Sequence, residues 1–249
     1  MRFERTGSNT TPALTPMSLA LVPVSSAARP VTDVILSRAD AAGASVPCLF
    51  LGNADAAKDA DLLKTLGITH VVTAAFGNPD PAHDVGAVHG DLVYHEVQIS
   101  DSSKTSLGPY LQPCADFIRD ALAAPQNRVL VHCMMGTSCS VSLTLFYMMR
   151  DMQYSLRDAL LHIMHQRSSN PHAPYTHPNQ GFMRQLIACE RNMSPSGEAS
   201  LDLADCQQGG QFFSGENVSH GPVAPPTARH RAAATAGSAG ATAEADSQK

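Results

Sequence analysis

The sequence lacks any long apolar run. No stretch approaches the roughly 18 to 20 consecutive apolar residues that cross a bilayer, which excludes a transmembrane protein. It also lacks an excess of basic residues, because 17 Lys and Arg stand against 22 Asp and Glu, giving a formal charge of −5. A chain with this balance has no electrostatic footprint for nucleic acid or an anionic membrane surface, so neither is an expected partner.

Closely spaced cysteine pairs are missing as well. The six cysteines are few for 249 residues and none forms a C-x-x-C pair, which argues against a disulfide scaffold. At the amino terminus, Glu4 and scattered prolines interrupt both a secretory apolar segment and a transit helix. We therefore expect reduced thiols, of which one can be reactive, and a cytoplasmic or nuclear location.

Apolar periodicity is absent from both ends of the chain. The first 28 residues are rich in Ser, Thr, Pro and Ala, and no Leu, Ile or Phe follows Phe213. Such segments bury too little apolar surface to offset the entropy of ordering them. We expect a disordered segment over 1–28, one folded domain over 29–193, and a low-complexity, mostly disordered tail over 194–249.

Short β-rich runs alternate with helical patterns inside this domain. Strands are predicted over 31–36, 47–51, 69–74, 92–99 and 128–131. One helix, capped by Asn53 and ending at Gly67, is expected after the second strand. Later apolar stripes predict helices over 111–122, 140–149, 156–163 and 182–189. This order predicts an α/β fold in which helices flank a central mixed sheet.

The segment that follows the fifth predicted strand carries the most chemical information. The strand ends in His132 and Cys133, a turn containing Gly136 follows, and Ser140 is expected to open a helix. The N–H groups of such a turn and of a helix amino terminus favour an anion, either a Cys133 thiolate or a bound phosphate. The same groups can lower a cysteine pKa enough to make a nucleophile at neutral pH. From these residues alone, Cys133 is either that nucleophile or a small buried apolar residue.

Residues 132–140 read His-Cys-Met-Met-Gly-Thr-Ser-Cys-Ser. This run resembles the active-site signature of cysteine-dependent dual-specificity protein phosphatases, His-Cys-x-x-Gly-x-Ser-Arg-Ser, at every fixed position except Cys139. Further blocks that resemble the family occur in the same order, at 49–54 with 62–71, 97–101 and 178–186. The resemblance implies a compact cysteine-phosphatase fold that dephosphorylates protein Ser, Thr or Tyr residues with no metal and no cofactor. Its implied partners are phosphoproteins.

The resemblance also implies roles for particular residues. Cys133 matches the nucleophile that forms a cysteinyl-phosphate, and Asp101 matches the general acid that protonates the leaving alcohol and then activates water. Ser140 matches the hydroxyl that assists departure of the thiolate. Two of these residues also have simpler interpretations, since Asp101 fits a solvated turn and Ser140 fits a helix N-cap.

The remaining matches surround the nucleophile. His132 is expected to orient the loop and tune the thiol, although it also fits a core histidine. Gly136 is expected to supply a backbone conformation that a β-carbon would hinder. Asn179 is expected to cap its own helix and to support the loop. The implied phosphate-binding loop consists of Cys133, Met134, Met135, Gly136, Thr137, Ser138 and Cys139.

Cys139 is the one departure from the signature. The Arg of the family holds two phosphoryl oxygens with a bidentate fork, which a thiol cannot do. Losing such a fork should cost on the order of 3 to 6 kcal/mol of transition-state stabilisation, roughly a hundredfold to ten-thousandfold in rate. The candidate substitutes lie in other predicted elements: Lys104, Arg119, Arg128, Arg150 and Arg184.

Three hypotheses about function follow from this departure. The first is a phosphoprotein-binding member of the family with impaired catalysis, a pseudophosphatase. The second is an active or weakly active phosphatase in which another cation replaces the Arg. The third is a redox sensor in which Cys133 and Cys139 form a disulfide. The sequence predicts no oligomeric state.

Overall fold

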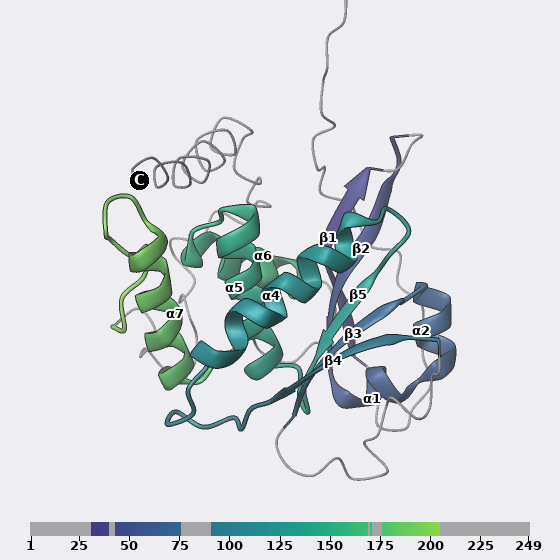
Figure 1. The fold of residues 1–249 in the computed structure, drawn as a ribbon, viewed down its shortest axis with the longest axis horizontal. Helices are drawn as coiled ribbons and strands as arrows, with labels where there is room; N and C mark the ends of the chain where they lie inside the picture. Colours follow the sequence, from purple (N-terminus) through teal and green to yellow (C-terminus); the bar gives the residue numbers. More distant parts are fainter. Residues whose placement is uncertain (1–30, 40–42, 76–90, 169, 171–175, 205–249) are drawn as a thin grey trace, which may run out of the picture.

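The computed structural model describes residues 31–39, 43–75, 91–168, 170 and 176–204. The segment 1–28 and most of the tail, both predicted to be disordered, lie outside the described residues. The described chain forms one twisted sheet with helices on both faces (Figure 1). This is the predicted α/β architecture.

The sheet has five strands in the order β1-β2-β5-β3-β4. Their bounds are β1 Thr32–Ala39, β2 Ser45–Gly52, β3 His70–Ala75, β4 Val93–Gln98 and β5 Val129–His132. β1 is antiparallel to β2, whereas β2, β5, β3 and β4 are parallel to one another. The predicted mixed sheet is therefore confirmed, and the four parallel strands end at one edge. Ligand sites of α/β sheets lie at this carboxyl edge.

Two short helices, α1 (Ala54–Lys58) and α2 (Ala60–Leu66), lie on one face of the sheet (Figure 1). The prediction of a single helix here was wrong. Asp59 is extended, with φ −85° and ψ 95°, and its carboxylate accepts the Leu62 N–H as a second N-cap. Asn53 caps only α1, and Gly67 ends α2 in the left-handed conformation, as predicted.

Four longer helices cover the other face (Figure 1). They are α4 (Gly108–Ala123), α5 (Cys139–Met152), α6 (Leu156–Ser168) and α7 (Gln180–Met193). α5 is buried along almost its whole length and contacts α4, α6 and α7. The all-round apolar pattern of its sequence predicted this central position. No helix of the described chain has the length and apolar character of a membrane span.

Packing continues beyond residue 193, where the sequence patterns place the end of the domain. Leu201 is buried against the main core. The buried carboxylate of Glu190 accepts hydrogen bonds from the Ser200 N–H and hydroxyl, both at 2.8 Å, and from the Leu156 N–H at 2.7 Å. Residues 194–204 are thus attached to the start of α6.

Candidate active site

The loop 133–138 leaves the carboxyl end of β5 and leads directly into α5. The helix begins at Cys139, so the simpler interpretation of Ser140, as the N-cap of this helix, was wrong. Ser138 occupies the cap position, but its hydroxyl does not cap the helix. Ser140 is instead the second residue of α5, and its hydroxyl lies 3.2 Å from the Cys133 sulfur. The loop therefore places a serine hydroxyl beside the thiol.

Cys133 lies in a shell of hydrogen-bond donors and is only 7% exposed. The Gly136 N–H donates to its sulfur at 3.2 Å. The pKa of Cys133 is lowered to about 5, first by the hydrogen bond from the Cys139 side chain and then by the groups of Ser140 and Gly136, which together outweigh the opposing effect of burial. At neutral pH this sulfur is a thiolate, the nucleophilic form.

Cys139 turns its side chain toward this thiolate. Its pKa is raised, first because its thiol donates to Cys133, then because it is buried and lies near the negative charges of Cys133 and Asp101. The thiol therefore keeps its proton at neutral pH. Position 139 supplies one weak S–H donor, where a guanidinium would supply five N–H donors and a positive charge.

The loop packs tightly against the turn between β2 and α1. Gly136 has a φ of +73°, and a Cβ at this position would lie 2.8 Å from the carbonyl oxygen of Gly52. The Ala54 N–H donates to the Met134 carbonyl at 3.1 Å. Two requirements, a left-handed backbone and a close backbone contact, thus call for glycine at position 136.

Asp101 lies beside the loop, three residues beyond the end of β4. One oxygen of its carboxylate accepts the Ser138 hydroxyl at 2.6 Å and the Asn179 side-chain amide at 2.7 Å. The Asn179 N–H in turn donates to the Ser138 hydroxyl at 3.1 Å. The sequence patterns contained no signal for this use of Ser138, which joins two segments that are distant in the chain.

Asn179 also caps α7, because its side-chain oxygen accepts the Phe182 N–H at 2.9 Å. The start of α7 and the segment after Asp101 are in close contact. A Cβ on Gly181 would lie 2.0 Å from the Ser103 carbonyl oxygen. Asn179 therefore occupies both of the positions expected for it, at the helix cap and next to the loop.

The His132 ring contacts the neighbouring strand β3. Its Nε2 lies 3.0 Å from the Thr73 hydroxyl on β3. Burial lowers the pKa of this imidazole to about 4. The ring is therefore neutral at physiological pH and brings no positive charge to the loop.

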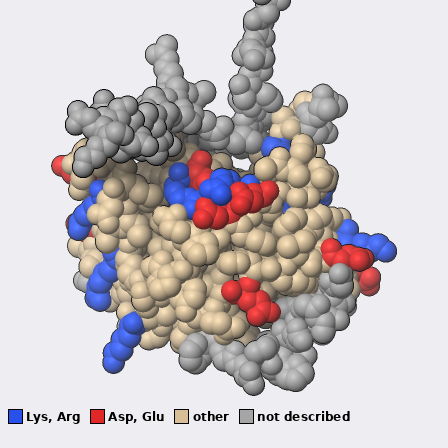
Figure 2. All heavy atoms as spheres, in the orientation of Figure 1, with Lys and Arg blue, Asp and Glu red and all other residues tan. Residues whose placement is uncertain are grey.

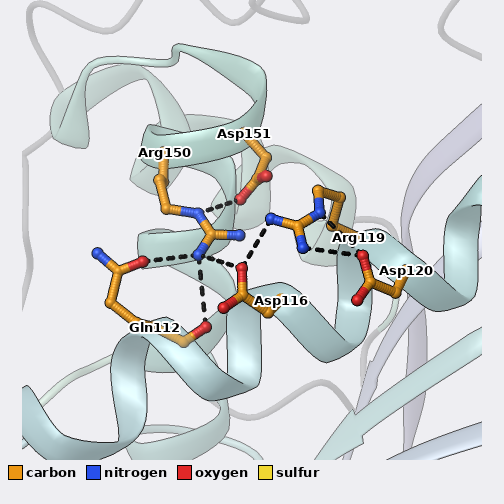
Figure 3. Close-up of polar contacts among 6 residues, drawn as sticks. All are labelled: Gln112, Asp116, Arg119, Asp120, Arg150 and Asp151. Carbon is orange, nitrogen blue, oxygen red and sulfur yellow. Dashed lines mark hydrogen bonds and ion pairs between the residues drawn. The ribbon is translucent and has the colours of Figure 1, made fainter. Parts of the chain in front are cut away.

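Two of the candidate substitute cations are engaged elsewhere (Figure 3). Arg119 pairs with Asp116 at 2.7 Å and with Asp120 at 2.9 Å, and Arg150 pairs with Asp116 and Asp151. Arg150 lies 11 residues beyond the start of α5, roughly 16 Å along the helix axis from the loop. Figure 2 shows a central cluster of mixed charge on this side of the molecule.

Arg128 is equally remote from the thiol. It precedes β5, at the end of the strand opposite to Cys133, and its guanidinium donates to the Leu66 carbonyl. Lys104 and Arg184 are exposed. Among the five cations considered, none has a hydrogen bond or ion pair to the loop within the described part of the chain.

Comparisons with known proteins show which family the chain resembles. Residues 49–192 match the family model of the dual specificity phosphatase catalytic domain. The chain is 40% identical to dual specificity protein phosphatase 13B of Homo sapiens over 148 residues, which cover 59% of this chain and 71% of that protein. It is 36% identical to dual specificity protein phosphatase 1 of Arabidopsis thaliana, covering 59% of this chain and 68% of that protein.

Solved structures are similar as well, among them a mouse putative dual specificity phosphatase complexed with zinc tungstate, with a TM-score of 0.50 and 26% identity. The match covers 73% of this chain and 99% of the mouse protein.

Proposed function

This chain belongs to the dual specificity phosphatase family, and from that premise we propose that it binds proteins phosphorylated on Ser, Thr or Tyr through the Cys133 loop while being impaired in their hydrolysis. The observation that carries the proposal is the side chain at position 139. It is a buried thiol that keeps its proton, where the family signature carries a positive charge.

Anion binding is supported by groups that do not depend on position 139. The loop leads straight into the amino terminus of α5, where unpaired N–H groups and the helix dipole favour negative charge. The Gly136 N–H already donates to the anionic sulfur. A phosphate seated above Cys133 would meet these same donors.

Hydrolysis requires more than this binding site. The Cys133 sulfur would attack phosphorus as the bond to the leaving oxygen breaks, and Asp101 would donate the proton that this oxygen takes up. Water activated by Asp101 would then release phosphate and restore the thiolate. Charge spreads over the equatorial oxygens during both steps, and the neutral Cys139 thiol cannot balance it. We therefore assign the impairment to the transition state rather than to the nucleophile.

Restoring the missing guanidinium tests this assignment. Cys139→Arg should raise turnover of an aryl phosphate by at least about a hundredfold, and adding Cys133→Ser should abolish the gain. Cys189→Arg is the matched control, because Cys189 is a half-buried cysteine on α7, outside the loop. It should leave turnover unchanged.

Two outcomes would contradict the proposal. If the native chain already matches the Cys139→Arg variant, another cation serves the loop and catalysis is not impaired. If the Cys139→Arg variant is folded but inert, the loop does not support phosphoryl transfer.

Binding needs a separate measurement. Inorganic phosphate or tungstate should bind the native chain at millimolar concentration in a calorimetric titration. Gly136→Ala should weaken that binding, since the substitution disturbs the backbone donors of the loop. Absence of phosphate and tungstate binding by the native chain would refute the binding half of the proposal.

A redox-sensing loop is a second candidate, favoured by the mutual effect of the Cys139 and Cys133 side chains on their pKa values, which indicates that the two sulfurs are close. Hydrogen peroxide would oxidise the Cys133 thiolate to a sulfenic acid. The Cys139 sulfur would then displace the oxygen as water, so that two thiols and one peroxide give one disulfide and two waters. Peroxide should lower the intact mass by about 2 Da, and the loss should vanish in Cys139→Ser. Accumulation of a Cys133 sulfinic acid without a bridge would refute it.

We expect phosphoproteins, rather than nucleic acid or a membrane surface, as the partners of this acidic chain. A cytoplasmic or nuclear location stays a prediction from the sequence.

A further inference from the structure

A buried ion pair between α6 and β1 has no place in the proposed reaction. Arg167, near the end of α6, is 4% exposed, and its Nε lies 3.0 Å from a carboxylate oxygen of Asp33 on β1. The other Asp33 oxygen accepts the Asn170 side-chain amide at 2.8 Å. The terminal nitrogens of Arg167 are buried and, among the described residues, have no hydrogen-bond partner. Unpaired buried N–H groups of a cation are costly, which makes an anion their natural partner.

The strand register locates this pair relative to the nucleophile. Asp33 is opposite Leu51 on β2, and Leu51 is opposite Val131 on β5. Val131 and Cys133 are two residues apart, so their side chains leave the same face of the sheet. This is the face that α5 and α6 cover. Arg167 therefore lies on the same side of the sheet as Cys133, two strands away.

The charges of the two groups interact across this space. Burial lowers the pKa of Arg167, while the negative charges of Asp33 and Cys133 raise it. A guanidinium stays protonated even when buried, so Arg167 keeps its charge. The hydrogen-bonding groups that lower the pKa of Cys133 are the neutral donors of Cys139, Ser140 and Gly136.

We propose that Arg167 is a positioning residue that supplies, from α6, part of the positive charge that the loop lacks at position 139. In this arrangement Arg167 stabilises the Cys133 thiolate and a phosphate bound above it through its field, without touching either. Asp33 holds the guanidinium in place and cancels part of its charge. The predicted effect on phosphate binding rests on the proposed function, whereas the predicted effect on the pKa of the Cys133 thiol does not.

Opposite substitutions in the ion pair separate charge from structure. Both Arg167→Met and Asp33→Asn remove one partner of a buried pair, so both should lower the melting temperature. Their effects on the pKa of Cys133 should have opposite signs. Arg167→Met should raise the pKa of Cys133 by at least about 0.5, whereas Asp33→Asn should lower it. Below that pKa, an increase of about 0.5 slows alkylation by iodoacetamide about threefold, because only the thiolate reacts.

The measurement uses the full chain. The rate of Cys133 alkylation is followed against pH by peptide mass spectrometry, with and without inorganic phosphate. Phosphate should protect Cys133 about threefold less well in Arg167→Met and better in Asp33→Asn. Arg128→Met is the matched control, because this arginine lies at the far end of β5, and it should change neither readout.

The results distinguish the two proposals. If phosphate gives no protection in the native chain, the proposed function fails, and the pH profile still decides the role of Arg167. Shifts of the Cys133 profile in the same direction in both variants, or no shift in either, would overturn that role. Should Arg167→Met not fold, Asp33→Asn alone decides it, and an unchanged pKa refutes the proposal.

Discussion

Replacing Cys139 with alanine should make the nucleophile less acidic. The Cys139 side chain is the largest of four hydrogen-bonding contributions that lower the pKa of Cys133 to about 5, the others being the Ser140 hydroxyl, the Ser140 backbone and the Gly136 backbone. An ordinary protein thiol titrates near 9, so these donors favour the thiolate by about 5 kcal/mol, even after the opposing effect of burial. Because the Cys139 contribution is the largest of the four, it should account for at least a quarter of this free energy.

The expected increase in the pKa of Cys133 is therefore about 1 or more, equivalent to a tenfold smaller thiolate fraction below the midpoint. Cys139→Ser should raise the pKa less, since a hydroxyl can donate in the place of the thiol. The assay is the rate of Cys133 alkylation between pH 3.5 and 9. Cys189 provides an internal reference in the same sample, because burial raises its pKa rather than lowering it.

Two results would refute this reasoning. A native Cys133 that titrates near 9 would mean that the donors of the loop do not act on its sulfur. A Cys139→Ala variant with the native midpoint would mean that the two thiols are independent. In the second case the redox proposal would lose its basis as well.

Two further predictions concern the packing around the loop. Gly181→Ala should lower the free energy of unfolding by at least about 2 kcal/mol, because the new Cβ would overlap the backbone of Ser103. Chemical denaturation measures this loss, and an unchanged denaturation midpoint would contradict the close contact. A chain ending at 193 should be less stable than one ending at 204, since it leaves the carboxylate of Glu190 short of two hydrogen bonds and exposes the site of Leu201; equal melting temperatures would place the boundary at 193.

The sequence predicts the elements of this fold better than their ends. All five strands and the central helix were predicted, because their apolar patterns span whole elements. The break between α1 and α2 was not predicted. The Asp59 side chain accepts the Leu62 N–H and so caps a second helix, while the apolar stripe continues past this break. The start of α5 was placed at Ser140 because a serine is a common cap, but this hydroxyl lies beside Cys133 instead.

The candidate site was predictable where residues follow one another in the chain, and less so across elements. The loop motif indicates Cys133 and Gly136 directly. The resemblance also indicates Asp101 and Asn179, and the structure brings these two within 2.7 Å of each other. The bond from Ser138 to Asp101 and the ion pair of Arg167 with Asp33 depend on tertiary packing, which no local pattern records.

The burial of α5 has a consequence for the history of this loop. The loop takes its shape from a helix that is packed on nearly every side and from a glycine seated against Gly52, and Cys139 is only the first of the many residues that α5 buries. Selection that merely preserves the core would also preserve the backbone shape of the loop 133–138. Under the proposed function, an exchange of arginine for cysteine at this position would remove turnover in one step and leave a folded loop that still binds phosphate, which later changes could adapt.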